Sequence, residues 1–365
     1  MLINKKELIV ALNKINSINS NFVYLESIEN NLFLKTYNSY SKIQYKISNI
    51  KKTDNIQVLI NSKILNSLIS KINSTLINLT QEQNNLLIEV ENSKFTLNGI
   101  DKNEFSLFNL EVNDSWNQTD ITLNDLLLIA KYVISYSVEE NGENTKLVNV
   151  NCINILNSND FLQAFATDLK RLVILKLKNN KKNLNKVNFL IYSKTFNQLL
   201  KCLNNNENIK IFNSDNNLLI QTDSYLLQIN LINLNFPNLT NIAVDQNKNI
   251  CEINNEELIQ KLERGSVLSS NLNSALAYFS FKNNEIILSF KNSEQGYACE
   301  ILKFNHISGQ MPNFSINVGY LINALKNISN PRVKFSIQDN LSPLFIYDLN
   351  NENLLQVILP TKNIF

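Results

Sequence analysis

The chain has 365 residues, of which 44% are hydrophobic and 18% charged, so it is long and apolar enough to fold into about two or three domains. Its 34 Lys and Arg residues nearly balance its 32 Asp and Glu residues, and the net charge of +2 gives no argument for or against nucleic acid binding. The single histidine, His306, excludes sites that need two histidines, and with them most zinc hydrolases.

The cysteines and the hydropathy pattern restrict the chemistry further. The four cysteines lie about fifty residues apart without a CxxC pair, so they are expected to be core thiols and not metal or redox ligands: Cys152, Cys202, Cys251 and Cys299. The N-terminal residues lack the apolar stretch of a signal peptide, and no segment approaches the length of a membrane span. We therefore expect a cytoplasmic protein without a membrane partner.

Along the chain, helical spacing of apolar residues alternates with short segments of period-two spacing. The helical spacing predicts six helices, at residues 5–15, after Ser62, at 124–138, after Ser193, at 254–269 and after Asn317. The period-two spacing predicts antiparallel strands with one buried face, among them 31–37, 86–90, 94–98, 218–222 and 285–290. This combination predicts an α+β fold.

The chain also contains an internal repeat. The strand-to-helix segment that begins at Leu59 recurs at Leu190, about 130 residues later, and more weakly at Phe314. In the first two copies, Ser62 and Ser193 are predicted to cap the helix. The repeat predicts three domains, 1–117, 118–248 and 249–365, each an antiparallel sheet with two helices.

Basic residues gather on the predicted helices, away from their apolar faces. Such lysines are common on any solvated helix face, and that interpretation stays open. The alternative is that the six helices jointly present a basic surface to phosphates, and the repeat favours it. The candidate DNA-facing residues are Lys14, Lys63, Lys71, Lys131, Lys194, Lys201, Lys261, Arg264 and Lys326.

Five segments together resemble one known family. They begin at Ser93 (Ser-Lys-Phe-Thr-Leu-Asn-Gly), Phe165 (Phe-Ala-Thr-Asp-Leu-Lys-Arg-Leu-Val), Phe236 (Phe-Pro-Asn-Leu), Asn317 (Asn-Val-Gly-Tyr-Leu-Ile-Asn-Ala-Leu) and Val357 (Val-Ile-Leu-Pro-Thr-Lys). In order and spacing, the chain is similar to the bacterial DNA polymerase III β subunit, the β sliding clamp. The resemblance implies three copies of the DNA clamp fold and a head-to-tail homodimer closed into a ring around duplex DNA.

The resemblance also implies a function and its partners. The chain would be a processivity factor that tethers the DNA polymerase III catalytic subunit, the clamp loader and other clamp-binding proteins through short apolar peptides. Twelve helices, from two subunits, would line a hole about 25 Å wide, enough for B-DNA. No nucleotide-binding Gly-rich loop or paired-carboxylate site stands out, so we expect no cofactor, no metal and no enzyme activity. The alternative is a structural scaffold that keeps the fold without encircling DNA.

Position by position, the resemblance assigns two sites. The peptide-binding cleft would comprise Val150, Thr167, Leu169, Lys170, Arg171, Leu172, Pro237, Asn241, Ile242, Tyr320, Leu341, Pro343, Val357, Leu359, Pro360, Thr361 and Lys362. The dimer interface would comprise Phe105, Phe108, Val267 and Leu268, although such apolar pairs also occur in cores.

Three cleft positions depart from the family pattern, so the shape of the pocket is open. Leu169 stands where the family usually has Gly or a small residue, Asn241 where it often has Arg, and Thr361 where it has a large apolar residue. We also expect the final residues, Ile364 and Phe365, to fold over the cleft, because two apolar residues beside an apolar groove are costly to expose.

Overall fold

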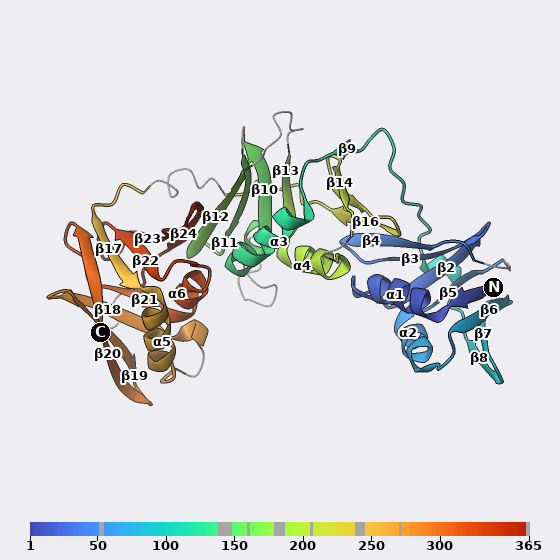
Figure 1. Ribbon diagram of the computed structural model, residues 1–365, viewed down its shortest axis with the longest axis horizontal. Coiled ribbons are helices and arrows are strands. Elements are labelled where there is room, and N and C mark those ends of the chain that lie inside the picture. The colour runs from blue at the N-terminus through green and yellow to red at the C-terminus, as the bar shows by residue number, and fades with distance from the viewer. Residues whose placement is uncertain are drawn as a thin grey trace. The chain divides into compact units, whose positions relative to one another are not determined.

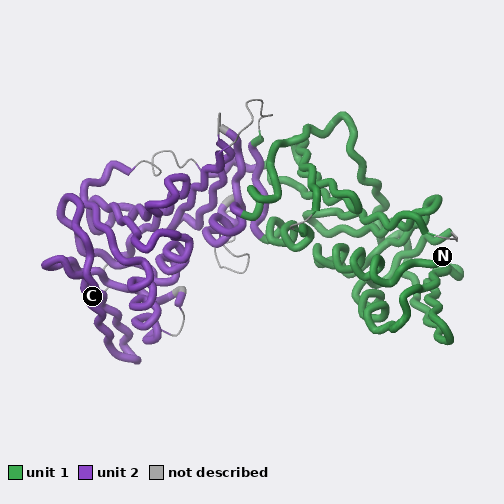
Figure 2. Tube along the Cα trace, in the orientation of Figure 1, with its two compact units in different colours: residues 1–127, 183–187, 194–233 green, residues 128–182, 188–193, 234–365 purple. Residues whose placement is uncertain are grey.

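The computed structural model describes residues 1–50, 55–137, 148–158, 161–178, 187–204, 207–237, 245–269 and 272–362 (Figure 1). The chain divides into two compact units (Figure 2). The first contains residues 1–127, 183–187 and 194–233, and the second contains residues 128–182, 188–193 and 234–365. In the described ranges, no helix has the length and apolar character needed to cross a membrane.

The first unit contains two antiparallel sheets. The four-stranded sheet has the order β1-β6-β7-β8 and the eight-stranded sheet the order β5-β2-β3-β4-β16-β15-β14-β9. Helices α1 (Lys5–Asn16) and α2 (Ser62–Lys71) lie side by side. The strands are β1 (Leu2–Asn4), β2 (Phe22–Ile28), β3 (Asn31–Tyr37), β4 (Ser41–Ile47), β5 (Gln57–Asn61), β6 (Leu76–Glu82), β7 (Asn85–Val90), β8 (Ser93–Leu97), β9 (Asn117–Gln118), β14 (Lys210–Asn213), β15 (Asn217–Gln221) and β16 (Tyr225–Asn230).

The second unit contains one antiparallel sheet of twelve strands, in the order β13-β10-β11-β12-β24-β23-β22-β17-β20-β19-β18-β21. Helices α5 (Asn255–Ser266) and α6 (Val318–Leu325) pack against each other. The strands are β10 (Cys152–Ser158), β11 (Phe161–Thr167), β12 (Arg171–Lys178), β13 (Asn188–Tyr192), β17 (Asn249–Asn254), β18 (Leu276–Lys282), β19 (Glu285–Asn292), β20 (Gly296–Ser308), β21 (Phe314–Asn317), β22 (Arg332–Ile337), β23 (Leu344–Asp348) and β24 (Asn351–Ile358).

The remaining helices are two α-helices in which the division between the units falls, and four short 3-10 helices. Helices α3 (Leu123–Tyr132) and α4 (Ser193–Cys202) each include residues of both units. Short 3-10 helices are η1 (Lys102–Glu104), η2 (Ile134–Tyr136), η3 (Val148–Asn151) and η4 (Leu272–Ser274). The described ranges thus contain the six expected α-helices, and the division into domains 1–117, 118–248 and 249–365 stays a prediction.

Apolar residues are buried where their spacing predicts. In β19, Ile286, Leu288 and Phe290 are buried while the residues between them are more exposed, as period-two spacing requires. On α2, Leu65 and Ile69 are fully buried one turn apart. As predicted for core thiols, Cys152, Cys202 and Cys251 are buried, whereas Cys299 is exposed.

Asparagine side chains cap the N-termini of four of the helices. Asn4, Asn61, Asn254 and Asn317 each accept a hydrogen bond from a backbone N–H in the first turn of α1, α2, α5 or α6. The prediction that Ser62 caps α2 is wrong by one residue, because the hydroxyl of Ser62 donates to the Ser20 carbonyl at 3.1 Å. Ser193 is likewise the first residue of α4 and not the residue before it.

Candidate functional site

The centre of the expected cleft is the turn that joins β11 to β12. The Thr167 hydroxyl donates to the Arg171 carbonyl (2.7 Å) and accepts the N–H of Leu169 (3.0 Å). One carboxylate oxygen of Asp168 accepts the N–H groups of Lys170 and Arg171, both at 2.9 Å. Four hydrogen bonds among five consecutive residues therefore hold the turn in one conformation.

The side chain of Arg171 is buried beneath this turn. Its Nε donates to Asp168 Oδ2 at 2.9 Å, and its guanidinium carbon lies 4.3 Å from the centroid of the Tyr320 ring and 5.1 Å from that of Tyr136. Burial, and then the charge of Asp168, raise the pKa of the Tyr320 phenol. The Arg171 guanidinium therefore contacts Tyr320 of α6, Tyr136 of η2 and the Asp168 carboxylate, and it joins the turn to both helices.

The last strand lies beside the strand that follows this turn. Strand β24 pairs with β12, so that Leu172 lies opposite Val357, and these two residues pack with Ile174 and Phe345 in one apolar cluster. After β24, the Leu359 N–H donates to the Lys170 carbonyl at 2.8 Å. The Thr361 N–H donates to the Ser315 carbonyl at 2.8 Å, which ties the following segment to β21.

The expected cleft residues divide by exposure. The exposed ones are Leu169, Lys170, Leu341, Leu359 and Lys362, and the half-buried ones are Pro237, Tyr320, Pro343, Pro360 and Thr361. The buried ones belong to the core and would support the expected cleft only from beneath: Val150, Thr167, Arg171, Leu172 and Val357. Asn241, Ile242, Ile364 and Phe365 lie outside the described residues.

Sequence reasoning missed two residues that shape this region. Asp168 belongs to a quoted segment, but its contacts with Arg171 were not expected from spacing. The Tyr136 hydroxyl donates to Gln356 Oε1 at 2.7 Å, and Gln356 in turn donates to the Ala324 carbonyl at 3.1 Å. No local signal could have found Tyr136, because its partner lies 220 residues away in the sequence.

The candidate DNA-facing residues differ in the exposure of their side chains and in their ion pairs. Lys63, Lys71, Lys131, Lys194 and Lys201 are exposed. Arg264 is exposed but forms two hydrogen bonds with Glu300, at 2.9 and 3.0 Å, and Lys326 forms an ion pair with Glu263 at 3.0 Å. The Lys261 side chain is only 15% exposed and lies 3.5 Å from Glu257 and from Glu300.

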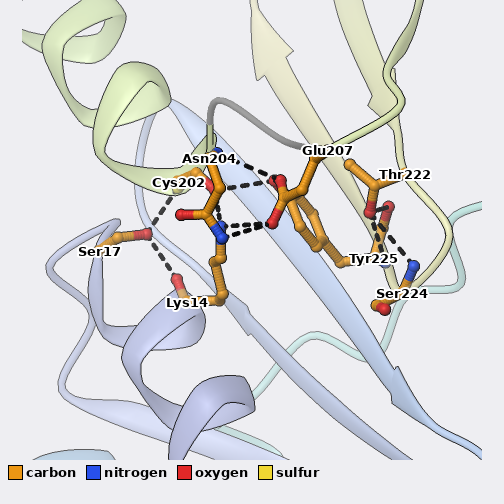
Figure 3. A network of polar contacts seen from close by, with 8 residues as sticks. All are labelled: Lys14, Ser17, Cys202, Asn204, Glu207, Thr222, Ser224 and Tyr225. Atoms are coloured by element: carbon orange, nitrogen blue, oxygen red, sulfur yellow. Dashed lines mark hydrogen bonds and ion pairs between the residues drawn. The ribbon is translucent and has the colours of Figure 1, made fainter.

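The expectation that Lys14 faces DNA is wrong. Its ammonium group is buried, forms a 2.9 Å ion pair with Glu207, donates to the Cys202 carbonyl and lies 5.2 Å from the centroid of the Tyr225 ring (Figure 3). The Tyr225 hydroxyl donates to Glu207 at 2.7 Å, which completes the network. Lys14 therefore joins α1 to α4 and β16, and it is not available to phosphates.

The candidate interface residues also differ in how exposed their side chains are. Phe105 is only 7% exposed, and its ring stacks on Tyr24 at 5.6 Å between centroids, so it is a core residue. Phe108 is half-buried. Val267, which follows α5, is 80% exposed, and Leu268 is half-buried. The expected interface role of Phe105 needs correction, because little of its side chain remains for a partner to touch.

Comparison with known proteins identifies the family. The sequence pattern of the "DNA polymerase III beta subunit, central domain" matches residues 127–238, and that of the C-terminal domain matches residues 243–362. Together they cover more than half of the chain. The chain belongs to the DNA polymerase III β subunit family. Members of this family are sliding clamps, which are non-catalytic processivity factors, so the predicted role as a processivity factor and the predicted lack of enzyme activity are confirmed.

Relatives and solved structures agree with this assignment. The β sliding clamp of Bacillus subtilis is 24% identical over 315 residues, which cover 84% of this chain and 80% of the relative. That of Mycoplasma capricolum is 26% identical over 284 residues, which cover 77% and 73%. The membership also favours the clamp function over a scaffold that does not encircle DNA.

The fold is that of solved clamps. The crystal structure of the Bacillus subtilis clamp has a TM-score of 0.87 at 20% identity and covers 99% of this chain and 98% of its own. The Pseudomonas aeruginosa β subunit has a TM-score of 0.89 at 16% identity, with full coverage of both chains. The predicted DNA clamp fold, a sheet-rich α+β fold of repeated antiparallel sheets, is therefore confirmed.

Proposed function

We propose that two copies of this clamp close head to tail into a ring around duplex DNA in the cytoplasm and tether the replicative polymerase to it. The observation that supports this most strongly is the family match over residues 127–238 and 243–362. A head-to-tail contact that closes produces a ring, and a ring holds DNA by topology without tight binding.

Exposed lysines on the helices would make the contacts to DNA. Lys63, Lys71, Lys131, Lys194 and Lys201 are exposed, and all but Lys131 belong to the first unit. Lysine is a strongly hydrated point charge on a flexible stem, so it attracts phosphates without fixing a register on the bases. Such contacts do not depend on the DNA sequence, as sliding requires. They weaken as the salt concentration rises.

Two open strand edges could join one copy to the next. Strand β8 pairs with β7 along one edge, and its residues Ser93–Thr96 are exposed. Strand β20 pairs only with β19 over Gly296–Lys303 among the described residues, and here Tyr297 and Ile301 are 61% and 52% exposed. Exposed edges readily pair with strands of another chain. Val267 and Leu268 would add apolar contact at the end of α5.

The cleft would bind the polymerase catalytic subunit, the clamp loader and other clamp-binding proteins. Its edge combines the exposed side chains of Leu169, Leu341 and Leu359 with those of Lys170 and Lys362. Such a surface suits a short extended peptide whose apolar side chains cover the leucines while its backbone hydrogen-bonds along the groove.

The ring is tested by the mass of the protein in solution. We expect a mass near twice 41.9 kDa in sedimentation, and a monomer for Leu268→Asp and for Val267→Asp, because a buried unpaired carboxylate opposes association. Leu349→Asp, at a 42% exposed leucine in the β23–β24 turn, serves as the matched control and should stay dimeric. A wild-type monomer, or dimeric Val267→Asp and Leu268→Asp variants, would contradict the proposal.

A further inference from the structure

The eight-stranded sheet of the first unit joins two groups of strands at one seam. Strands β2–β5 come from residues 22–61 and β14–β16 from residues 210–230, and in the described ranges the pairing of β4 with β16 connects the two groups. This seam runs from Ser41, opposite Ile229, to Tyr45, opposite Tyr225. Because one antiparallel ladder holds the two groups together in the sheet, the seam is the place where they can swing apart.

An ion pair crosses the seam on the face of the sheet that α1 covers. On this face, the rings of Tyr45 and Tyr225 stack across the seam, with 5.9 Å between their centroids. The Lys14 ammonium lies 5.2 Å from the centroid of the Tyr225 ring and 2.9 Å from Glu207 Oε1 (Figure 3). Lys14 belongs to α1, which packs on β3 and β4, whereas Glu207 precedes β14 and contacts Tyr225 of β16. The ion pair therefore ties one group of strands to the other.

The opposite face of the seam is covered by the segment that connects β8 to β9. Gln44, whose side chain points away from that of Tyr45, accepts the Leu110 N–H at 3.1 Å and donates to the Leu110 carbonyl at 3.3 Å. The segment also includes a bridge between Ile100 and Leu59 in β5, and it ends in β9, which pairs with β14. Because it spans both groups of strands on this face, opening of the seam is opposed on the other face by the ion pair.

The second unit contains an equivalent seam, the pairing of β12 with β24, that is held differently. Gln356 of β24 is fully buried. Its side chain accepts the Tyr136 hydroxyl at 2.7 Å and donates to the Ala324 carbonyl at 3.1 Å. The ion pair of Arg171 with Asp168 joins residues of one turn and does not cross this seam. The described contacts of the second seam thus use a neutral amide where the first unit uses a charged pair.

We propose that the seam between β4 and β16 is a hinge of the first unit and that the ion pair of Lys14 with Glu207 is the latch that keeps it closed. Loss of either charge lets the two groups of strands separate locally while each keeps its own pairing. A buried ion pair suits a latch, because removing one charge leaves the other without a partner. In the proposed ring, on which this consequence alone rests, the hinge would change the curvature of the chain without breaking a contact between copies.

Hydrogen exchange of the full chain, read by mass spectrometry of peptic fragments, tests the latch. Glu207→Gln and Lys14→Met should each accelerate exchange in β4 and β16 by roughly tenfold or more. The most direct reporters are fragments that contain the N–H groups of Lys46 and Asn230, which donate across the ends of the seam at 2.8 and 2.9 Å. Exchange in β6 and β7, which belong to the other sheet of the same unit, should stay at the wild-type rate.

A second buried ion pair of the first unit provides the matched control. Lys35 and Glu26 lie 2.8 Å apart, with side chains 6% and 18% exposed, against 9% and 23% for Lys14 and Glu207. They lie on the neighbouring strands β3 and β2 of one group, so this pair does not cross the seam. Glu26→Gln should therefore leave exchange at the seam unchanged.

The double variant Lys14→Met with Glu207→Gln separates the latch from the cost of an unpaired charge. It leaves neither charge without a partner, yet the tie across the seam is gone, so the fast exchange at the seam should persist. Wild-type exchange at the seam in the double variant, or in both single variants, would overturn the proposal. Equal acceleration in β6 and β7, or at the seam in Glu26→Gln, would also overturn it, because the pair would then be a general stabiliser. None of these results bears on whether the protein closes into a ring.

Discussion

Single residues show how burial separates structural charges from functional ones. Lys14 and Lys63 both looked like helix-surface lysines in the sequence, yet the Lys14 side chain is 9% exposed and paired with Glu207, whereas Lys63 is exposed. Lys14→Met should lower the free energy of unfolding by about 2–4 kcal/mol, because it leaves the Glu207 carboxylate unpaired. Urea unfolding measures this change.

Lys63→Met is the matched control for this prediction. It should change the free energy of unfolding by less than about 0.5 kcal/mol, since it alters an exposed side chain. Anisotropy with a short duplex at low salt should show weaker binding for Lys63→Met and unchanged binding for Lys14→Met. A Lys14→Met variant with wild-type stability and weakened DNA binding would contradict the burial of Lys14.

The carboxylate of Glu300 should make the stability depend on pH. The hydrogen bonds from Arg264 lower its pKa from the ordinary value of 4.5. Because the folded pKa is the lower one, the stabilisation is present above about pH 4.5 and is lost as the pH falls through the folded value. Glu300→Gln should therefore lose less stability than the wild type between about pH 6 and 3.

Urea unfolding at several pH values measures this difference. Glu285→Gln, at an exposed glutamate of β19, is the control and should follow the wild-type pH profile. Equal acid sensitivity in Glu300→Gln and the wild type would show that the Arg264 pair contributes nothing to folding.

At the scale of elements, spacing predicts where a helix lies better than where it ends. The expected helix at 124–138 ends at Tyr132 and continues as the 3-10 helix Ile134–Tyr136. The side chains of Val133 and Tyr136 remain buried beyond the end of the α-helix, so their apolar spacing could not mark that end. In the same way, Ile328 stays buried after α6 ends at Leu325.

The N-cap of α2 gives a direct test at this scale. Asn61 Oδ1 accepts the N–H groups of Lys63 and Ile64 at 3.1 and 3.0 Å. Asn61→Ala should lower the free energy of unfolding by about 1 kcal/mol, because two N–H groups lose their acceptor. Asn124→Ala, in the first turn of α3 and exposed, should leave it unchanged or slightly higher. Equal effects of the two substitutions in thermal or urea unfolding would refute the cap.

Over the whole molecule, the proposed cleft would be assembled from segments that no local pattern connects. The turn after β11, the loop before β23 and the segment after β24 meet because β12 pairs with β24 and β24 with β23. The spacing of apolar residues was sufficient to predict the α+β fold class and the six α-helices. The cleft positions came from the family resemblance, whereas spacing alone could not show that Arg171 is buried or that Leu169 is exposed.

Small-angle X-ray scattering of the purified protein tests the central claim most directly, because one curve reports both mass and hollowness. We predict a mass near twice 41.9 kDa and the pair-distance distribution of an annulus, with a central hole of about 25 Å, the width left by twelve lining helices. A compact or elongated particle of 41.9 kDa would contradict a self-closing ring.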